Sequence, residues 1–224
     1  MRERTAAMAA IPAVSMRSRA RQPVPRLNPR RFEICMKAAR IFVQKGFDAT
    51  SVSDIAAALG VTKAGLYHHI ESKEALLYDI VSLGMDWLDE DVIRPVSGIA
   101  DPETRLEQIL VRHATLTACN EGWITILLDD IEALKPPQRR GIEHRKRVYV
   151  EIVRNTLVEL QRAGRLRPLD PMVAALGVLG MIVWLPRWVK PRRSLSCDQV
   201  ARQIADIALA GLLLPPQGRT DDRP

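Results

Sequence analysis

The sequence lacks the residue patterns by which most enzymes and metal proteins are recognised. It has no glycine-rich phosphate loop, no nucleophile elbow and no HExxH motif. Its three cysteines, Cys35, Cys119 and Cys197, lie far apart and form no CxxC pair, so neither a disulfide framework nor a zinc site is indicated. We therefore expect no catalysis, no metal and no cofactor, and the reducing cytoplasm is the compartment that fits these thiols.

Long apolar runs and strand-like alternation of apolar and polar residues are also missing. The longest apolar stretch, residues 172–186, is shorter than the roughly 20 residues that cross a bilayer, and Arg187 follows it directly. Apolar residues recur instead at helical spacing, with no repeat of fixed period. These features predict an all-α protein without a membrane span, and they argue against a solenoid.

Acidic residues are almost absent from the start of the chain. Before Glu33, Glu3 is the only acid, against eight arginines: Arg2, Arg4, Arg17, Arg19, Arg21, Arg26, Arg30 and Arg31. The formal charge of +7 and the pI of about 9.7 favour a polyanionic partner, either nucleic acid or an acidic lipid surface. We interpret residues 1–30 as a disordered basic arm, although its composition also fits a transit peptide and Met8 and Met16 offer later starts.

What the sequence does contain is enough for two packed domains, because it has 224 residues and 47% of them are apolar. Helical periodicity begins at Arg31, and Gly46 ends that first helix. The stretch from Ser51 to Asp54 has the form of a capping box and predicts the start of a second helix. Gly60 ends this second helix after about two turns.

Two further helices follow closely. Thr62 can cap a short third helix over residues 63–70, whose Leu66 and Ile70 point inward at i, i+4 spacing. Ser72 caps a fourth helix, which should end near Pro95 because the residue before proline avoids helical geometry.

Two short helices joined by the turn at residues 60–62 predict a helix-turn-helix, whose second helix enters the major groove of DNA. Lys63 can contact a phosphate or a guanine edge, while Tyr67 and His68 can donate to phosphate oxygens. A second interpretation of the polar residues is structural: Ser51 and Thr62 only cap helices, and Lys63 is a solvated surface lysine. Adjacent His68 and His69 diverge by about 100° on a helix, which argues against a shared metal ion.

Four segments in this region carry a resemblance to a known family. They are ARIFVQKG at residues 39–46, TSVSDIA at 50–56, LGVTKAGLYHH at 59–69 and SKEAL at 72–76. In this order and spacing, over roughly residues 32–78, the chain resembles the TetR/AcrR family of transcription regulators. The resemblance implies a helix-turn-helix head over residues 31–78 and an all-helical ligand-binding and dimerisation domain over 79–214.

The resemblance also implies how such a protein works. Two heads of a homodimer bind a near-palindromic double-stranded DNA operator, about 34 Å or a multiple of it apart, and a small ligand in the larger domain changes their spacing. The positions that match DNA-contacting residues of the family are Thr50, Ser51, Ser53, Thr62, Lys63, Gly65, Tyr67, His68 and Lys73. Ile70 departs from the family, which usually has Phe there, so looser packing under the third helix is expected.

The rest of the chain is also helical in pattern. Helices are expected from about residue 102, at 123–134, at 137–163 closed by Gly164, at 171–188 and at 197–214, giving about nine in all, with a disordered tail at 215–224. The resemblance implies that the last two helices form a four-helix bundle with those of a second subunit.

The most distinctive local feature of this half is the segment from Trp184 to Trp188, in which Pro186 can kink the helix. It resembles a W-x-x-R-W-like stretch in family members that respond to acyl-CoA thioesters of fatty-acid or steroid breakdown. An apolar tunnel would hold the acyl chain, and arginines or lysines would bind CoA phosphates, namely Arg187 and, further along, Lys190, Arg192 or Arg193. The alternative is that both tryptophans pack at the dimer interface and Arg187 caps a helix.

Other ligand-binding candidates follow from the family's cavity-lining helices. With the segment above, the full set is Leu116, Trp123, Leu127, Tyr149, Val153, Trp184, Arg187 and Trp188. Most of these are also plausible core residues, but a buried phenol at Tyr149 needs a hydrogen-bond partner that a ligand could supply.

Three other functions stay open at this point. Asp129, Asp130 and Glu132 would suit a repressor of a drug-efflux system that binds cationic drugs, although a solvated surface is the preferred interpretation of their clustering. A transcriptional activator would have the same fold. An architectural DNA-binding protein would have a solid core in the larger domain and no ligand response.

Overall fold

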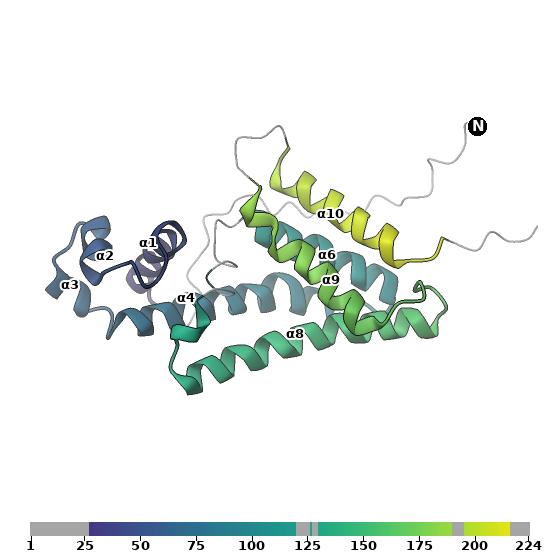
Figure 1. Ribbon diagram of the computed structural model, residues 1–224, viewed down its shortest axis with the longest axis horizontal. Helices are drawn as coiled ribbons and strands as arrows, with labels where there is room; N and C mark the ends of the chain where they lie inside the picture. The colour runs from purple at the N-terminus through teal and green to yellow at the C-terminus, as the bar shows by residue number, and fades with distance from the viewer. Residues whose placement is uncertain (1–26, 120–125, 127–129, 190–194, 216–224) are drawn as a thin grey trace, which may run out of the picture.

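The computed structural model describes residues 27–119, 126, 130–189 and 195–215. Within them, the regular secondary structure is helical, and one isolated bridge joins Leu166 and Leu213. A small head lies at one end of an elongated molecule, and a larger helical body forms the other end (Figure 1). The predicted all-α class with an N-terminal helix-turn-helix head is therefore confirmed. No helix in the described ranges combines the length and the apolar character needed to cross a bilayer.

The head is built from α1 (Pro29–Lys45), α2 (Val52–Leu59) and α3 (Lys63–Tyr67). Asn28 caps α1 by accepting a hydrogen bond from the Arg31 amide at 2.8 Å, and Pro29 stands at the first helical position. Leu27 is buried, so the predicted disordered arm, residues 1–30, is wrong at its end: residues 27–30 belong to the head. The rest of the arm lies outside the described residues.

Local capping signals fix the second and third helices. Ser51 and Asp54 form the predicted capping box at the start of α2, and Gly60 ends that helix in the left-handed region at φ 68°. Thr62 caps α3, which is shorter than predicted and ends at Tyr67 instead of residue 70. Ile70 still packs inward with Leu66, and both are almost fully buried, so the expected looseness under α3 is not seen.

One continuous helical rod connects head and body. It consists of α4 (Lys73–Leu88), a π-helical turn η1 (Asp89–Ile93) and α5 (Arg94–Val96), and the predicted end near Pro95 is confirmed. Pro95 has no N–H to donate to the Asp91 carbonyl, and Arg112 of the body donates to that carbonyl at 3.4 Å. The predicted domain boundary between residues 78 and 79 falls inside α4, so head and body share this helix.

The body consists of α6 (Pro102–Ala118), η2 (Ile131–Ala133), α8 (Pro136–Arg162), α9 (Pro171–Val183), η3 (Leu185–Arg187) and α10 (Cys197–Leu212). In Figure 1, α8 and α9 cross the body alongside α6, and α10 covers it on the side away from α8. The predicted 137–163 helix corresponds to α8, but most of the predicted 123–134 helix and the 215–224 tail lie outside the described residues.

The prediction for the helix at 171–188 is wrong at its C-terminal end. Pro186 does not kink a longer helix: α9 ends at Val183, and residues 185–187 form a 3-10 turn. The physical reason is that Pro186 cannot donate to the carbonyl four residues earlier and its ring crowds that position.

Candidate nucleic-acid interface and effector site

The exposed side of α3 carries polar side chains over a buried anchor. Leu66 and Ile70 are buried beneath the helix, whereas Lys63, Tyr67 and His68 are exposed, with 46% of Tyr67 accessible. A short helix with this division can enter a major groove about 12 Å wide while staying packed on its head. Three of the sequence-predicted DNA-binding residues therefore lie together on one exposed element.

Two more predicted residues shape the start of α3. Thr62 accepts a hydrogen bond from the Gly65 amide at 3.0 Å. A Cβ at Gly65 would lie 3.2 Å from the Thr62 hydroxyl oxygen, closer than ordinary contact, so a side chain there would disturb the cap. The geometry gives both residues a structural role at the helix start, which is compatible with contact to DNA.

The start of α2 shows the same combination. The Ser51 hydroxyl accepts from the Asp54 amide at 3.1 Å and donates to the Asp54 carboxylate at 2.7 Å, and Ser53 is exposed in the first turn. The hydrogen bond from the Ser51 hydroxyl, with further ones from its backbone N–H and from Lys45, lowers the pKa of Asp54 to about 2. This exposed cap therefore stays charged at neutral pH.

Two residues predicted to contact DNA phosphates are turned into the protein instead. Thr50 is buried, and its hydroxyl donates to the Gly46 carbonyl at 2.7 Å. The Lys73 ammonium donates to the carbonyls of Phe47 at 2.9 Å and of Thr50 at 3.0 Å, and it lies 4.2 Å from the centre of the Phe47 ring. Lys73 thus fastens the loop between α1 and α2, and in this conformation its ammonium does not point to solvent.

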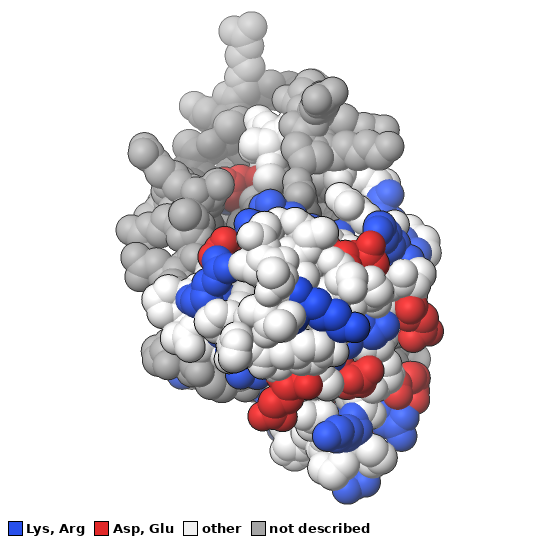
Figure 2. All heavy atoms as spheres, turned by 90° about the vertical axis from the view of Figure 1, so that its left-hand side faces the viewer, with Lys and Arg blue, Asp and Glu red and all other residues white. Residues whose placement is uncertain are grey.

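The head end of the molecule carries the charges that DNA would meet. Figure 2 views the protein from this end: Lys and Arg side chains lie across the middle of the face amid uncharged surface, and both acidic and basic side chains lie toward its right and lower parts. The exposed Lys63 belongs to the uncharged and basic surface that α3 presents. An interface of this kind favours contact with a polyanion.

Ion pairs fix α4 to both parts of the molecule. Within the head, the Arg31 guanidinium of α1 lies 2.6 Å from the Asp79 carboxylate. In the body, Arg145 of α8 lies 2.9 Å from Asp86 and 2.6 Å from Asp89, the residue with which the π-helical turn begins. These ion pairs connect α8 directly to the helix that carries the head.

The interior of the body holds a polar pair between α6 and α8. The Tyr149 hydroxyl lies 3.0 Å from Nδ1 of His113, and both side chains are buried. Burial lowers the pKa of His113 to about 4 and raises the pKa of Tyr149, so both groups are uncharged at neutral pH. His113 is therefore the hydrogen-bond partner that the buried phenol requires, and contact of Tyr149 with a ligand stays a prediction.

The other predicted effector residues divide into three groups. Leu116 and Val153 are buried on the same two helices as His113 and Tyr149. Trp123 and Leu127 lie outside the described residues. Sequence reasoning missed His113 and also Thr117, although both stand on the apolar face of α6 one helical turn apart, where a polar residue is itself a signal.

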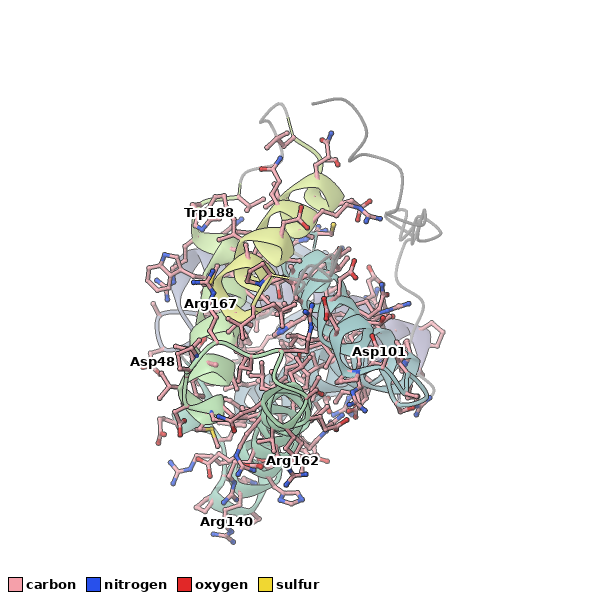
Figure 3. The ribbon with its side chains drawn as sticks, turned by 90° about the vertical axis from the view of Figure 1, so that its right-hand side faces the viewer. Asp48, Asp101, Arg140, Arg162, Arg167 and Trp188 are labelled. Carbon is pink, nitrogen blue, oxygen red and sulfur yellow. The ribbon has the colours of Figure 1, made fainter. Side chains whose placement is uncertain are left out.

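The third group lies on the surface of the chain. Trp184 is 56% exposed and Trp188 is 41% exposed, and the Arg187 guanidinium stacks 4.4 Å from the centre of the Trp184 ring. In Figure 3, Trp188 lies at the edge of the molecule near α10. Other large apolar side chains are exposed on α9 and α10, namely Val173, Leu176, Met181 and Ile207. Trp184 and Trp188 therefore extend an exposed apolar surface instead of lining the interior of a single chain.

Within the described ranges, no three His, Cys, Asp or Glu side chains are grouped closely enough to hold a metal ion. His68 and His69 are both exposed.

The head and the body each match a protein-family model. Residues 34–80 match the model for bacterial regulatory proteins of the tetR family, and residues 100–212 match the tetracyclin repressor-like C-terminal domain. Together the two matches span most of the described chain. The head and the body thus match the N-terminal and C-terminal domains of the same family of regulators.

Similar proteins of known structure or curated function point the same way. The transcriptional repressor KstR2 of Mycobacterium tuberculosis is 28% identical over 192 residues, which cover 83% of this chain and 94% of KstR2. Its structure has a TM-score of 0.79 to this one. The crystal structure of AibR in complex with isovaleryl coenzyme A and operator DNA is 36% identical, covers 81% of this chain and 96% of AibR, and has a TM-score of 0.72. PfmR, a TetR family regulator from Thermus thermophilus, is 34% identical over 80% of this chain and 97% of its own, with a TM-score of 0.71.

Proposed function

Because this chain belongs to the TetR family and is a ligand-controlled, DNA-binding transcriptional repressor, we propose that α3 binds its operator and that an acyl-CoA thioester is the effector that releases it. The observation that carries the DNA half of the proposal is the arrangement of α3. Its exposed Lys63, Tyr67 and His68 stand over the buried Leu66 and Ile70, so the helix can enter a groove without losing its packing.

The effector half of the proposal is supported by a related complex and by the body of this protein. AibR, which is 36% identical to this chain, has been crystallised in complex with isovaleryl coenzyme A and operator DNA. In this chain, the His113–Tyr149 pair offers a buried polar point between the apolar faces of α6 and α8, which suits a largely apolar ligand with one polar group. Arg187 remains our candidate for a CoA phosphate, whereas the candidates at 190, 192 and 193 lie outside the described residues.

The exposed apolar surface of α9 and α10 supports the assembly that this function needs. Val173 and Ile207 are among the most exposed large apolar side chains of the protein, and small residues at Gly177 and Gly180 allow a second helix to approach closely. TetR regulators are dimers, and we infer that these two helices meet their copies in the partner subunit. Two α3 helices then bind a near-palindromic operator.

We also infer that this protein acts as a regulator alone. Its family is one of DNA-binding transcription regulators. Operator DNA and CoA thioesters are cytoplasmic, and we place the protein there.

Fluorescence anisotropy with the DNA upstream of the protein's own gene tests the proposal. We expect tight, salt-sensitive binding by the wild-type dimer and release on addition of isovaleryl-CoA or palmitoyl-CoA. Lys63→Ala should weaken binding, whereas Lys146→Ala on α8 in the body is the matched control and should leave it unchanged. If the protein binds DNA but neither thioester releases it, the DNA-binding part of the proposal stands and the acyl-CoA effector is refuted.

A further inference from the structure

The His113–Tyr149 pair has one hydrogen-bond donor more than its own contact uses. A neutral imidazole carries one N–H and the phenol carries one O–H, and the contact at 3.0 Å consumes only one of these hydrogens. If the phenol donates to Nδ1, the imidazole N–H at Nε2 remains; if Nδ1 donates, the phenol O–H remains. In either tautomer the pair presents one donor to a third group.

Thr117 places a second donor on the same side of α6. It stands four residues after His113, and four-residue spacing puts two side chains on one helix face. The Thr117 residue is 1% exposed, and its hydroxyl has no hydrogen-bond partner among the described residues. Leaving such a group unpaired in the interior is unfavourable, which points to an acceptor that completes the site.

Thr156 of α8 is a buried threonine whose hydroxyl is paired, in contrast to that of Thr117. It is equally buried, but its hydroxyl donates to the Ile152 carbonyl one turn back at 3.0 Å. This bond to the carbonyl one turn back is a common arrangement for a helical threonine. Thr117 does not do so, and its hydroxyl is directed elsewhere.

The buried polar side chains that the structure describes on α6 and α8 set the chemical character of the site. Among the described residues, the buried polar side chains of α6 and α8 are uncharged: Gln108, His113, Thr115, Thr117, Tyr149 and Thr156. A carboxylate brought here would lose its hydration without gaining a cation. A carbonyl oxygen, in contrast, accepts two hydrogen bonds and needs no countercharge.

We propose that His113, Thr117 and Tyr149 form an uncharged donor site that binds the thioester carbonyl oxygen of the acyl-CoA effector and discriminates against the free carboxylate. This inference rests on the proposed function and names the chemical group that the body recognises. The acyl chain then lies against the neighbouring apolar residues of the same helices, Leu116 and Val153.

Paired ligands that differ only at the carbonyl test this inference. Isothermal titration of the full-length dimer would compare isovaleryl-CoA with S-isopentyl-CoA, the thioether in which a methylene replaces the carbonyl, and with isovalerate. The same comparison would use palmitoyl-CoA, S-hexadecyl-CoA and palmitate. We expect the thioester to bind at least about tenfold more tightly than its thioether, because the thioether leaves two buried donors unpaired. The free acids should bind more weakly still.

Substitutions assign the preference to these residues. Thr117→Val and Tyr149→Phe should each bring the thioester-to-thioether affinity ratio toward one, while Thr156→Val, the same change at a satisfied hydroxyl, should keep it. Should Tyr149→Phe fail to fold, Thr117→Val tests the site by itself, since it removes a hydroxyl that has no partner. Operator binding by each variant checks that the fold is intact.

The possible results separate this inference from the proposed function. Equal affinity of wild-type protein for thioester and thioether would overturn the carbonyl site and leave the acyl-CoA effector in place. An unchanged ratio in Thr117→Val would do the same. Absence of binding by every CoA compound would overturn the effector and the carbonyl site together.

Discussion

The guanidinium of Arg145 on α8 lies 2.9 Å from the carboxylate of Asp86 on α4, so the helix that lines the body is tied to the helix that carries the head. The same guanidinium reaches Asp89 at 2.6 Å, where the π-helical turn begins. Tyr149, at the proposed effector site, stands one helical turn further along α8 and on the same face. A shift of α8 on effector binding would therefore reach α4 through Arg145.

We expect Arg145→Gln to weaken the coupling between effector and DNA. The effector-induced loss of operator affinity should shrink by at least about fivefold, because coupling free energies of about 1–3 kcal/mol need a contact that both sites influence. Affinity for DNA alone should change little. Anisotropy titrations with and without acyl-CoA measure both quantities. Arg154→Gln is the control, since Arg154 pairs with Glu151 within α8 at 3.0 Å; full release by the Arg145 variant would contradict the coupling role.

Lys73 and Lys63 should behave differently although both resemble DNA-contacting positions. Lys73→Ala removes charge-assisted bonds to two carbonyls and should cost about 1–3 kcal/mol of folding free energy, seen as a lower thermal midpoint. Lys63→Ala should leave the midpoint unchanged and reduce the slope of log affinity against log salt by about two, since the dimer loses two phosphate contacts. If Lys73→Ala changes the slope of log affinity against log salt and leaves the thermal midpoint unchanged, Lys73 contacts DNA and has no role in stability.

The contrast between these lysines shows what local sequence signals can predict. Caps and glycines act within a few residues, and so Ser51 and Gly60 placed α2 correctly from the sequence. The partners of Lys73 lie up to 26 residues earlier in the chain, and no pattern in the sequence connects them. A motif match therefore located the element and misassigned the direction of this one side chain.

The effector site shows the same limit. His113 lies on the buried face of its helix, but its partner Tyr149 is 36 residues away. The pairing depends on how α6 and α8 pack, and their long-range packing is not encoded in either helix separately. For the same reason the sequence predicted Trp184 and Trp188 as ligand contacts, whereas the fold leaves both exposed on the chain's surface.

Stability measurements on two threonines provide a test of the carbonyl site without any ligand. Thr117→Val replaces an unpaired buried hydroxyl and should leave the free energy of unfolding unchanged or raise it by up to about 1 kcal/mol. Thr156→Val breaks the bond to the Ile152 carbonyl and should lower it by about 1 kcal/mol. Urea denaturation of the two variants in parallel gives the comparison. A clear loss of stability in Thr117→Val would mean that its hydroxyl is already satisfied.

Burial of His113 should make the stability of the protein depend on pH in a defined window. The pKa of His113 is lowered to about 4 in the folded state, against an ordinary value of 6.5 in the unfolded chain. The unfolded state therefore takes up a proton first as the pH falls, and the stability present above pH 6.5 is lost progressively down to about pH 4. The loss amounts to roughly 3 kcal/mol for this one group.

The variant His113→Gln isolates this contribution because glutamine does not titrate in that range. Urea denaturation at about pH 7.5, 6 and 5 should show a steeper decline of unfolding free energy for the wild type than for the variant. Asp54 does not interfere, since its lowered pKa of about 2 moves its own contribution below about pH 4. Parallel pH profiles for the two proteins would show that His113 is protonated as easily in the folded chain as in water, and the neutral donor site would then lose its basis.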